Sequence, residues 1–121
     1  MVKVLVVDDD DALRESLCDI LEGAGVEACG AADGGAALEA IRDGDVDAMV
    51  LDMHMPGLSG LGVLAALEAG RPNVVVYSAF EYVDQRALTS AFGDRVCAIL
   101  RKPTPPGELV HRVFECAGIG S

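Results

Sequence analysis

Five short apolar runs recur along the chain, and amphipathic helical patterns fill the gaps between them. The runs are mostly continuous rather than alternating, which is typical of strands buried on both faces of a sheet. They cover residues 2–7, 26–30, 47–51, 73–77 and 96–100. Repeated strand–helix alternation implies right-handed crossovers and helices on both faces of a parallel sheet. We therefore predict an α/β fold with a doubly wound sheet in the strand order 2-1-3-4-5.

The segments between the runs and after the last one predict five helices, three of which begin after a side chain suited to capping. Asp10 or Asp11 can cap the first, Asp33 the second and Ser59 the third. The third is expected over residues 60–69 and the fourth over residues 83–92, and the fifth begins after Pro105-Pro106. The expected buried stripes are Leu61, Leu64 and Leu67 in the third helix, and Val83, Ala87, Leu88 and Ala91 in the fourth.

The length of 121 residues fits one domain, so we expect residues 1–121 to share a single core. No run of about 18 apolar residues and no basic-plus-apolar leader is present, which argues against a membrane span or a signal peptide. We therefore expect a cytoplasmic protein.

The net charge of −11 argues against direct binding of nucleic acid, because that affinity comes mainly from cations that neutralise phosphates. Proteins or a small cation such as a metal ion are the expected partners. The four cysteines are widely spaced and form no C-x-x-C pair, and they are Cys18, Cys29, Cys97 and Cys116. We expect reduced, buried thiols rather than a disulfide framework or a zinc site.

Charged side chains follow three of the predicted strands at their C-terminal ends. The first strand ends in Asp8-Asp9-Asp10-Asp11, the third ends at Asp52, and the fifth leads into Lys102. Any one of these could simply begin a turn. In an open parallel sheet, however, ligands bind outside the carboxyl ends of the strands. We therefore expect two acidic strand ends and one basic strand end to meet at one site.

Three carboxylates about 6 Å apart would repel by about 3 kcal/mol per pair at an effective dielectric constant of about 20. Such a cluster is costly unless a cation enters it. Mg²⁺ prefers oxygen ligands and retains waters, so it fits a cluster of carboxylates of this kind.

The residues at these strand ends resemble the receiver domains of two-component response regulators. The matching segments are Val6-Val7-Asp8-Asp9, Asp52-Met53-His54-Met55-Pro56-Gly57-Leu58-Ser59-Gly60, Ser78-Ala79 and Lys102-Pro103. The resemblance implies a flavodoxin-like (βα)5 fold and a phosphoacceptor at Asp52. The phosphoryl donor would be a sensor histidine kinase or a phosphotransfer protein, and phosphorylation would switch a protein-interaction surface.

By the same resemblance, Asp9 and Asp52 would bind Mg²⁺ directly together with the backbone carbonyl of His54, and Asp8 would act through water. Lys102 would help to stabilise the charge on the phosphoryl oxygens. Two further features are implied at neighbouring strand ends, namely a Ser78 hydroxyl that binds the product and a cis peptide bond before Pro103.

The chain departs from the family pattern at three positions near the fifth strand. Ile99 stands where receivers usually carry an aromatic residue that swings inward on phosphorylation, so coupling through an aromatic rotamer is not expected. Thr104 replaces a common phenylalanine. Ala98 replaces the aspartate of one dimerising, DNA-binding branch, so we do not place the chain in that branch.

Two positions are expected from the resemblance to set the lifetime of the phosphorylated form, and here they are His54 and Phe80. An apolar ring beside the path of the attacking water should slow hydrolysis, whereas an imidazole could either orient the water or block it. Phe80 could equally be a packing residue of the fourth helix.

Two alternative functions remain open for the sequence. The chain could be a receiver-like interaction module that is not phosphorylated, or an aspartate-nucleophile phosphohydrolase. Such hydrolases usually carry a second acid two residues after the nucleophile, where this chain has His54. We therefore expect no enzyme activity beyond self-catalysed phosphoryl transfer and slow autodephosphorylation.

Overall fold

The computed structural model describes residues 2–55, 57–67, 72–79 and 85–118. Within these ranges strands and helices alternate along the chain, as predicted. The strands are β1 (Lys3–Val7), β2 (Glu27–Ala31), β3 (Ala48–Leu51), β4 (Asn73–Ser78) and β5 (Val96–Arg101). The helices are α1 (Asp11–Gly23), α2 (Gly34–Asp43), α3 (Gly60–Ala66), α4 (Gln85–Phe92) and α5 (Pro106–Ala117), with a short 3-10 turn at Gly93–Arg95.

The strands form one parallel sheet in the order β2-β1-β3-β4-β5, which confirms the predicted fold and strand order. Val7 pairs with Leu51, the last residue of β3. Between the next pair of strands, β4 and β5, Ser78 pairs with Arg101, and both residues end their strands. These pairings bring the C-terminal ends of β1, β3, β4 and β5 to one edge of the sheet.

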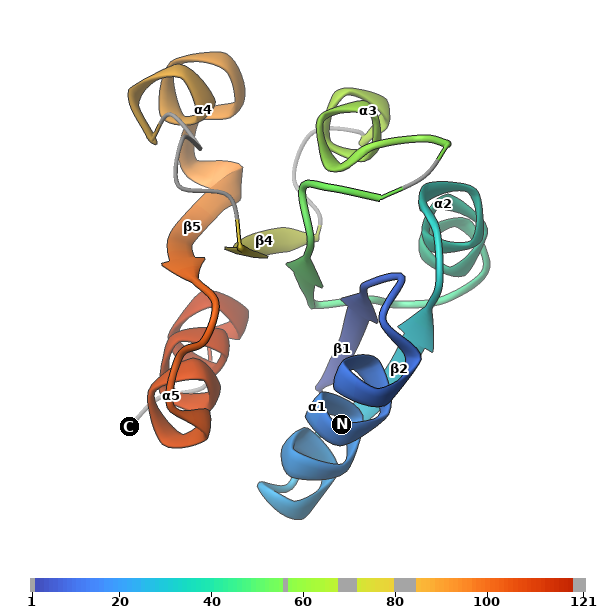
Figure 1. The fold of residues 1–121 in the computed structure, drawn as a ribbon, viewed down its shortest axis with the longest axis vertical. Coiled ribbons are helices and arrows are strands. Elements are labelled where there is room, and N and C mark those ends of the chain that lie inside the picture. The colour runs from blue at the N-terminus through green and yellow to red at the C-terminus, as the bar shows by residue number, and fades with distance from the viewer. Residues whose placement is uncertain (1, 56, 68–71, 80–84, 119–121) are drawn as a thin grey trace.

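Helices cover both faces of the sheet (Figure 1). Helices α1 and α5 lie on one face, and α2, α3 and α4 lie on the other. The apolar core is divided in the same way, because alternate residues of each strand point to opposite faces. Val4, Val6 and Val50 belong to the α1–α5 side, whereas Leu5 and Met49 belong to the α2–α4 side.

The predicted helix caps are present at three helix starts. Asp10 rather than Asp11 caps α1, where its carboxylate accepts a hydrogen bond from Leu13 N at 3.1 Å. Asp33 accepts from Ala36 N at 2.8 Å, and the Ser59 hydroxyl accepts from Gly62 N at 3.3 Å. Each cap satisfies a backbone N–H that has no partner within its helix.

Helix α3 differs from its prediction in both length and buried face. It ends at Ala66 because Leu67 has an extended backbone, with φ −72° and ψ 138°. Leu61, which was expected to face inward, is 53% exposed, and Val63 is fully buried instead. The buried face follows the spacing Gly60, Val63, Leu64 and Leu67, so Leu61 lies about 100° around the helix from Gly60.

The predicted stripe of α4 is only partly correct. Leu88 is buried, but Ala87 and Ala91 are exposed, and Val83 lies outside the described residues. Leu88 and the half-buried Phe92 pack the described part of this helix against the core. Among the residues that the structure describes, no helix has the length and apolar character needed to cross a membrane.

The prediction of four reduced cysteines is wrong for one pair. Cys97 of β5 and Cys116 of α5 form a disulfide, with their Cα atoms 5.7 Å apart. The two residues meet because α5 folds back along the sheet beside β5, which brings together positions 19 residues apart in the chain. Cys18 and Cys29 are free, and desolvation by burial is the main reason that the pKa of each thiol is raised.

Candidate functional site

Three carboxylates gather where β1 and β3 end. Asp8 directly follows β1 and Asp52 directly follows β3, and both side chains are buried, with residue exposures of 2% and 5%. Asp9, which follows Asp8 in the chain, is exposed. One carboxylate oxygen from each of the three aspartates lies within 4.8 Å of the others. The structure therefore brings together the acidic residues that the sequence placed at separate strand ends.

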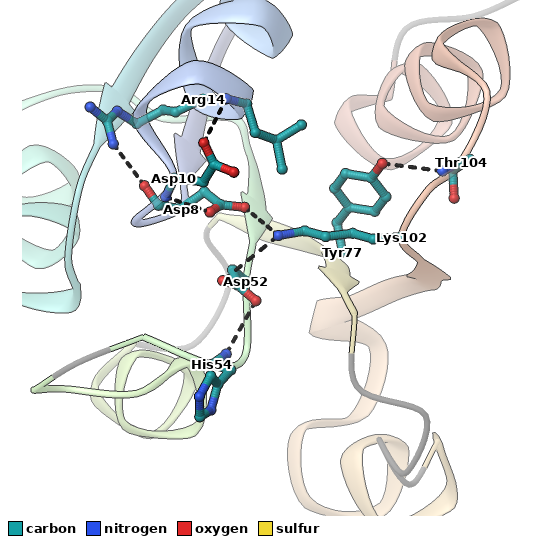
Figure 2. A network of polar contacts seen from close by, with 9 residues as sticks. Asp8, Asp10, Arg14, Asp52, His54, Tyr77, Lys102 and Thr104 are labelled. Carbon is teal, nitrogen blue, oxygen red and sulfur yellow. Dashed lines mark hydrogen bonds and ion pairs between the residues drawn. The ribbon is translucent and has the colours of Figure 1, made fainter.

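Lys102 approaches this cluster from the segment between β5 and α5 (Figure 2). Its Nζ atom lies 2.6 Å from Asp8 Oδ2 and 3.8 Å from Asp52 Oδ2. The Lys102–Pro103 peptide bond is cis, as the resemblance implies. A single ammonium group thus faces two buried carboxylates.

Backbone N–H groups orient the two buried carboxylates. Asp8 Oδ1 accepts a hydrogen bond from Asp10 N at 2.9 Å, and Asp52 Oδ1 accepts one from His54 N at 3.2 Å. The His54 ring is exposed and extends away from Asp8 and Asp52 in Figure 2. The contact between His54 and the phosphoacceptor candidate is therefore made by its backbone N–H.

Burial is the main reason that the pKa of Asp52 is raised above its ordinary value. The hydrogen bond from His54 N and the charge of Lys102 act in the opposite direction, whereas Asp8 and Asp9 raise the pKa further. With three carboxylates and one ammonium, the site carries an excess of negative charge. A close set of carboxylate oxygens with this excess of negative charge fits a hard divalent cation such as Mg²⁺.

The remaining candidate residues occupy different surroundings. Ser78 is buried at the end of β4, and its carbonyl accepts a hydrogen bond from Lys102 N at 3.0 Å. Ile99 is half-buried in β5, pairs with Val76 and packs against the core on the α2–α4 side. Phe80 lies outside the described residues.

Three further residues shape the site through contacts that the sequence did not predict. Arg14 Nη1 donates to Asp8 O at 2.8 Å, while its Nη2 contacts Asp11 Oδ1 at 2.6 Å. The Asp11–Arg14 spacing of i, i+3 on a helix could have indicated this ion pair. Tyr77 is the second of the three residues, and its hydroxyl accepts a hydrogen bond from Thr104 N, two residues after Lys102.

Gly60 is the third of these residues. A Cβ atom at Gly60 would lie 2.6 Å from Met53 Cα and 2.7 Å from Asp52 O, so the start of α3 packs directly against the backbone of the phosphoacceptor candidate. No local signal in the sequence distinguishes this close approach from an ordinary glycine at a helix start.

Comparison with known proteins agrees with the fold and the strand-end residues. Residues 4–114 match the response regulator receiver domain family, and the chain belongs to that family. It is therefore a receiver domain of the type found in two-component signalling systems.

Two curated relatives show how such domains occur in longer proteins. The chain is 39% identical over 114 residues to the DNA-binding response regulator MtrA of Mycolicibacterium smegmatis, which covers 92% of this chain and 48% of MtrA. It is also 39% identical over 130 residues to protein-glutamate methylesterase/protein-glutamine glutaminase 5 of Myxococcus xanthus, which covers 97% of this chain and 37% of that enzyme. The chain thus spans less than half the length of both relatives.

Solved structures share the fold. A CheY-like receiver domain from Methanospirillum hungatei superposes with a TM-score of 0.88 at 24% identity, covering 98% of this chain and 94% of that one. The response regulator TrrA of Thermotoga maritima, solved in complex with Mg²⁺ and BeF, has a TM-score of 0.83 at 29% identity, with coverages of 96% and 99%. The second structure shows a related receiver that holds Mg²⁺ together with a beryllium fluoride.

Proposed function

We propose that this receiver domain is a phosphorylation-controlled switch in which Asp52 is the phosphoacceptor. One observation carries the proposal: Asp52 is buried beside two further carboxylates, and the Lys102 ammonium lies 3.8 Å from its Oδ2 atom. A nucleophile, a cation and candidate ligands for a metal thus occupy one sheet edge. The proposed donor is a phosphohistidine of a sensor histidine kinase or of a phosphotransfer protein.

In the proposed reaction, a carboxylate oxygen of Asp52 forms a bond to the phosphorus atom. The bond between phosphorus and the donor nitrogen breaks, and the electron pair returns to the imidazole of the donor, which takes up a proton. The hydrogen bond from His54 N to Asp52 Oδ1 holds the carboxylate in one orientation. Holding the nucleophile in place reduces the entropy that must be lost on the way to the transition state.

Asp9, Asp52 and the backbone carbonyl of His54 would hold Mg²⁺, and Asp8 would reach it through water. The hydrogen bonds that both Asp8 oxygens already accept, from Asp10 N and from Lys102 Nζ, support this indirect role for Asp8. When bound, Mg²⁺ supplies positive charge that stabilises the phosphoryl oxygens in the transition state.

Lys102 and Ser78 are the proposed ligands of the transferred phosphoryl group. The ammonium of Lys102 lies close enough to Asp52 to contact a phosphoryl group attached there. The Ser78 hydroxyl would bind another phosphoryl oxygen and bias the β4–α4 segment toward the phosphorylated state. Moving an equilibrium from 1:99 to 99:1 takes about 5.5 kcal/mol, whereas one charge-assisted hydrogen bond contributes roughly 1.5–3 kcal/mol, so the full switch needs Lys102 as well as Ser78.

The proposed domain covers residues 1–121 and has no enzyme activity beyond its own phosphorylation and slow dephosphorylation. Its relatives include a DNA-binding regulator and a methylesterase, so the output would come from a partner or from another part of a longer protein. The charge of −11 argues against nucleic-acid binding by this domain itself. A cytoplasmic location would follow from pairing with the kinase domain of a sensor.

Acetyl phosphate with Mg²⁺ tests this function without a known kinase. Intact-protein mass spectrometry should detect one phosphoryl group on the wild type and none on Asp52→Asn. Asp45→Asn is the matched control, because Asp45 is an exposed aspartate outside the cluster, and this variant should react as the wild type does. A wild type that stays unmodified under conditions that phosphorylate other receivers would favour a receiver-like interaction module instead.

A further inference from the structure

Tyr77 lies beside the Lys102 side chain on the core side of the site (Figure 2). It is the residue before Ser78 in β4 and is only 4% exposed. The Lys102 Nζ atom lies over its ring, 5.6 Å from the ring centroid. This distance is within the range of about 6 Å in which an ammonium is attracted to an aromatic face.

The hydroxyl of Tyr77 contacts the same segment from another direction. It accepts a hydrogen bond from Thr104 N at 3.1 Å, which satisfies a polar group that burial would otherwise leave unpaired. Two residues earlier in this segment, Lys102 N donates a hydrogen bond to Ser78 O at 3.0 Å. Two successive residues of β4 therefore hold the backbone at Lys102 and at Thr104, on both sides of Pro103.

A lysine side chain loses considerable rotamer entropy when it is fixed, because its four-carbon stem is flexible. Here the ammonium has carboxylates on one side and an aromatic face on the other. We infer that Tyr77 is a positioning residue for Lys102: its ring restricts the ammonium to the space beside Asp8 and Asp52, and its hydroxyl fixes the segment that carries the lysine. The catalytic consequence of this role rests on the proposed phosphorylation of Asp52.

A double-mutant cycle separates this role from simple packing. Tyr77→Leu and Tyr77→Phe are prepared with Lys102 and again with Lys102→Met, and the initial rate of phosphorylation by acetyl phosphate is measured at saturating Mg²⁺. With Lys102 present, we expect Tyr77→Leu to lower the rate by roughly tenfold and Tyr77→Phe, which keeps the ring, by only about two- to threefold. With Lys102→Met, neither change at Tyr77 should lower the rate further.

The same fold loss in both backgrounds would overturn the inference, because a packing defect acts whether or not the lysine is present. If Tyr77→Leu does not fold, the cycle with Tyr77→Phe alone carries the test. If Tyr77→Phe lowers the phosphorylation rate at least twofold with Lys102 and not with Lys102→Met, the result supports positioning. A rate loss that persists with Lys102→Met, or no rate loss in Tyr77→Phe, contradicts a role for the hydroxyl.

NMR provides a readout that does not depend on phosphorylation. The ε-methylene protons of Lys102 should show an upfield ring-current shift in the wild type and in Tyr77→Phe, and this shift should disappear in Tyr77→Leu. A wild type that shows the shift but is not phosphorylated would contradict the proposed function and still support the placement of Lys102 by Tyr77. A phosphorylated wild type without the shift, and with additive mutations in the cycle, would remove this inference alone.

Discussion

The ammonium group of Lys102 lies 2.6 Å from Asp8 Oδ2, although the two residues are 94 positions apart in the chain. Asp8 follows β1, and Lys102 follows β5, which lies beyond β3 and β4 in the sheet. Neighbouring strands are about 4.8 Å apart, so only a long side chain on a suitably directed loop can span this part of the edge. The ion pair therefore connects the segment after β5 to the end of β1.

Mg²⁺ should raise the melting temperature of the wild type. A cation that binds only the folded state at ten times its dissociation constant adds about 1.4 kcal/mol, which corresponds to roughly 5 °C for a domain of this size. Differential scanning fluorimetry with EDTA or with millimolar Mg²⁺ measures the shift. Asp9→Asn should reduce it and Asp45→Asn should retain it, whereas identical curves for the wild type in both buffers would count against the metal site.

Asp52→Asn should stabilise the metal-free protein at neutral pH. Because burial raises the folded-state pKa of Asp52 above 3.8, the folded protein holds this proton more tightly than the unfolded chain does. The resulting contribution to stability is complete below pH 3.8 and is lost as the pH rises through the folded-state pKa. Urea denaturation in EDTA measures the free energy of unfolding from acid to neutral pH. The difference between Asp52→Asn and the wild type should grow in favour of the variant as the pH rises. A constant difference would show that the charge of Asp52 is not the cause.

Gly60→Ala should destabilise the protein and also slow phosphorylation. The new Cβ atom would meet Met53 Cα and Asp52 O, which belong to the backbone and cannot move aside as a flexible side chain can. Such overpacking typically costs about 1–3 kcal/mol. Gly107→Ala is the matched control, since a Cβ atom there meets nothing within 4 Å and alanine favours the helix. Equal stability of the two variants in urea would contradict the close packing of α3 on the Asp52 backbone.

Reduction of the Cys97–Cys116 disulfide should lower the melting temperature. The bond closes a loop between residues 19 positions apart, and a loop of this length is expected to contribute about 3 kcal/mol through the entropy of the unfolded chain. Melting with and without a reductant should therefore differ by on the order of 10 °C. Cys97→Ser should melt as the reduced wild type does and should not respond to the reductant. An unchanged wild type, with mass spectrometry showing free thiols before reduction, would exclude the bond in solution.

Phe80 should slow loss of the phosphoryl group, as the sequence predicts. If its ring keeps water from reaching the phosphorus in line, both Phe80→Glu and Phe80→Ala should lose phosphate faster than the wild type. Phosphate release after removal of the donor gives the rate. Unchanged rates in both variants would leave Phe80 as a packing residue.

The sequence alone predicted the alternation of strands and helices, a cap for α1 at Asp10 or Asp11, the caps of α2 and α3, and the meeting of Asp8, Asp52 and Lys102 at one edge. These features follow from local rules, because apolar periodicity sets the elements, short polar side chains begin the helices, and parallel strands bring their carboxyl ends together. The family resemblance rests on the same strand-end residues, and the match over residues 4–114 agrees with it.

Only the tertiary structure decided how the helices are rotated on the sheet and which distant side chains meet. The exposure of Leu61, the pairing of Cys97 with Cys116 and the contact of Gly60 with Asp52 all depend on packing between separate elements. The hydrogen bond from Thr104 N to the Tyr77 hydroxyl joins residues 27 positions apart. Local propensity carries no information about such contacts, because each is set by the relative placement of elements that pack against one another through the shared core.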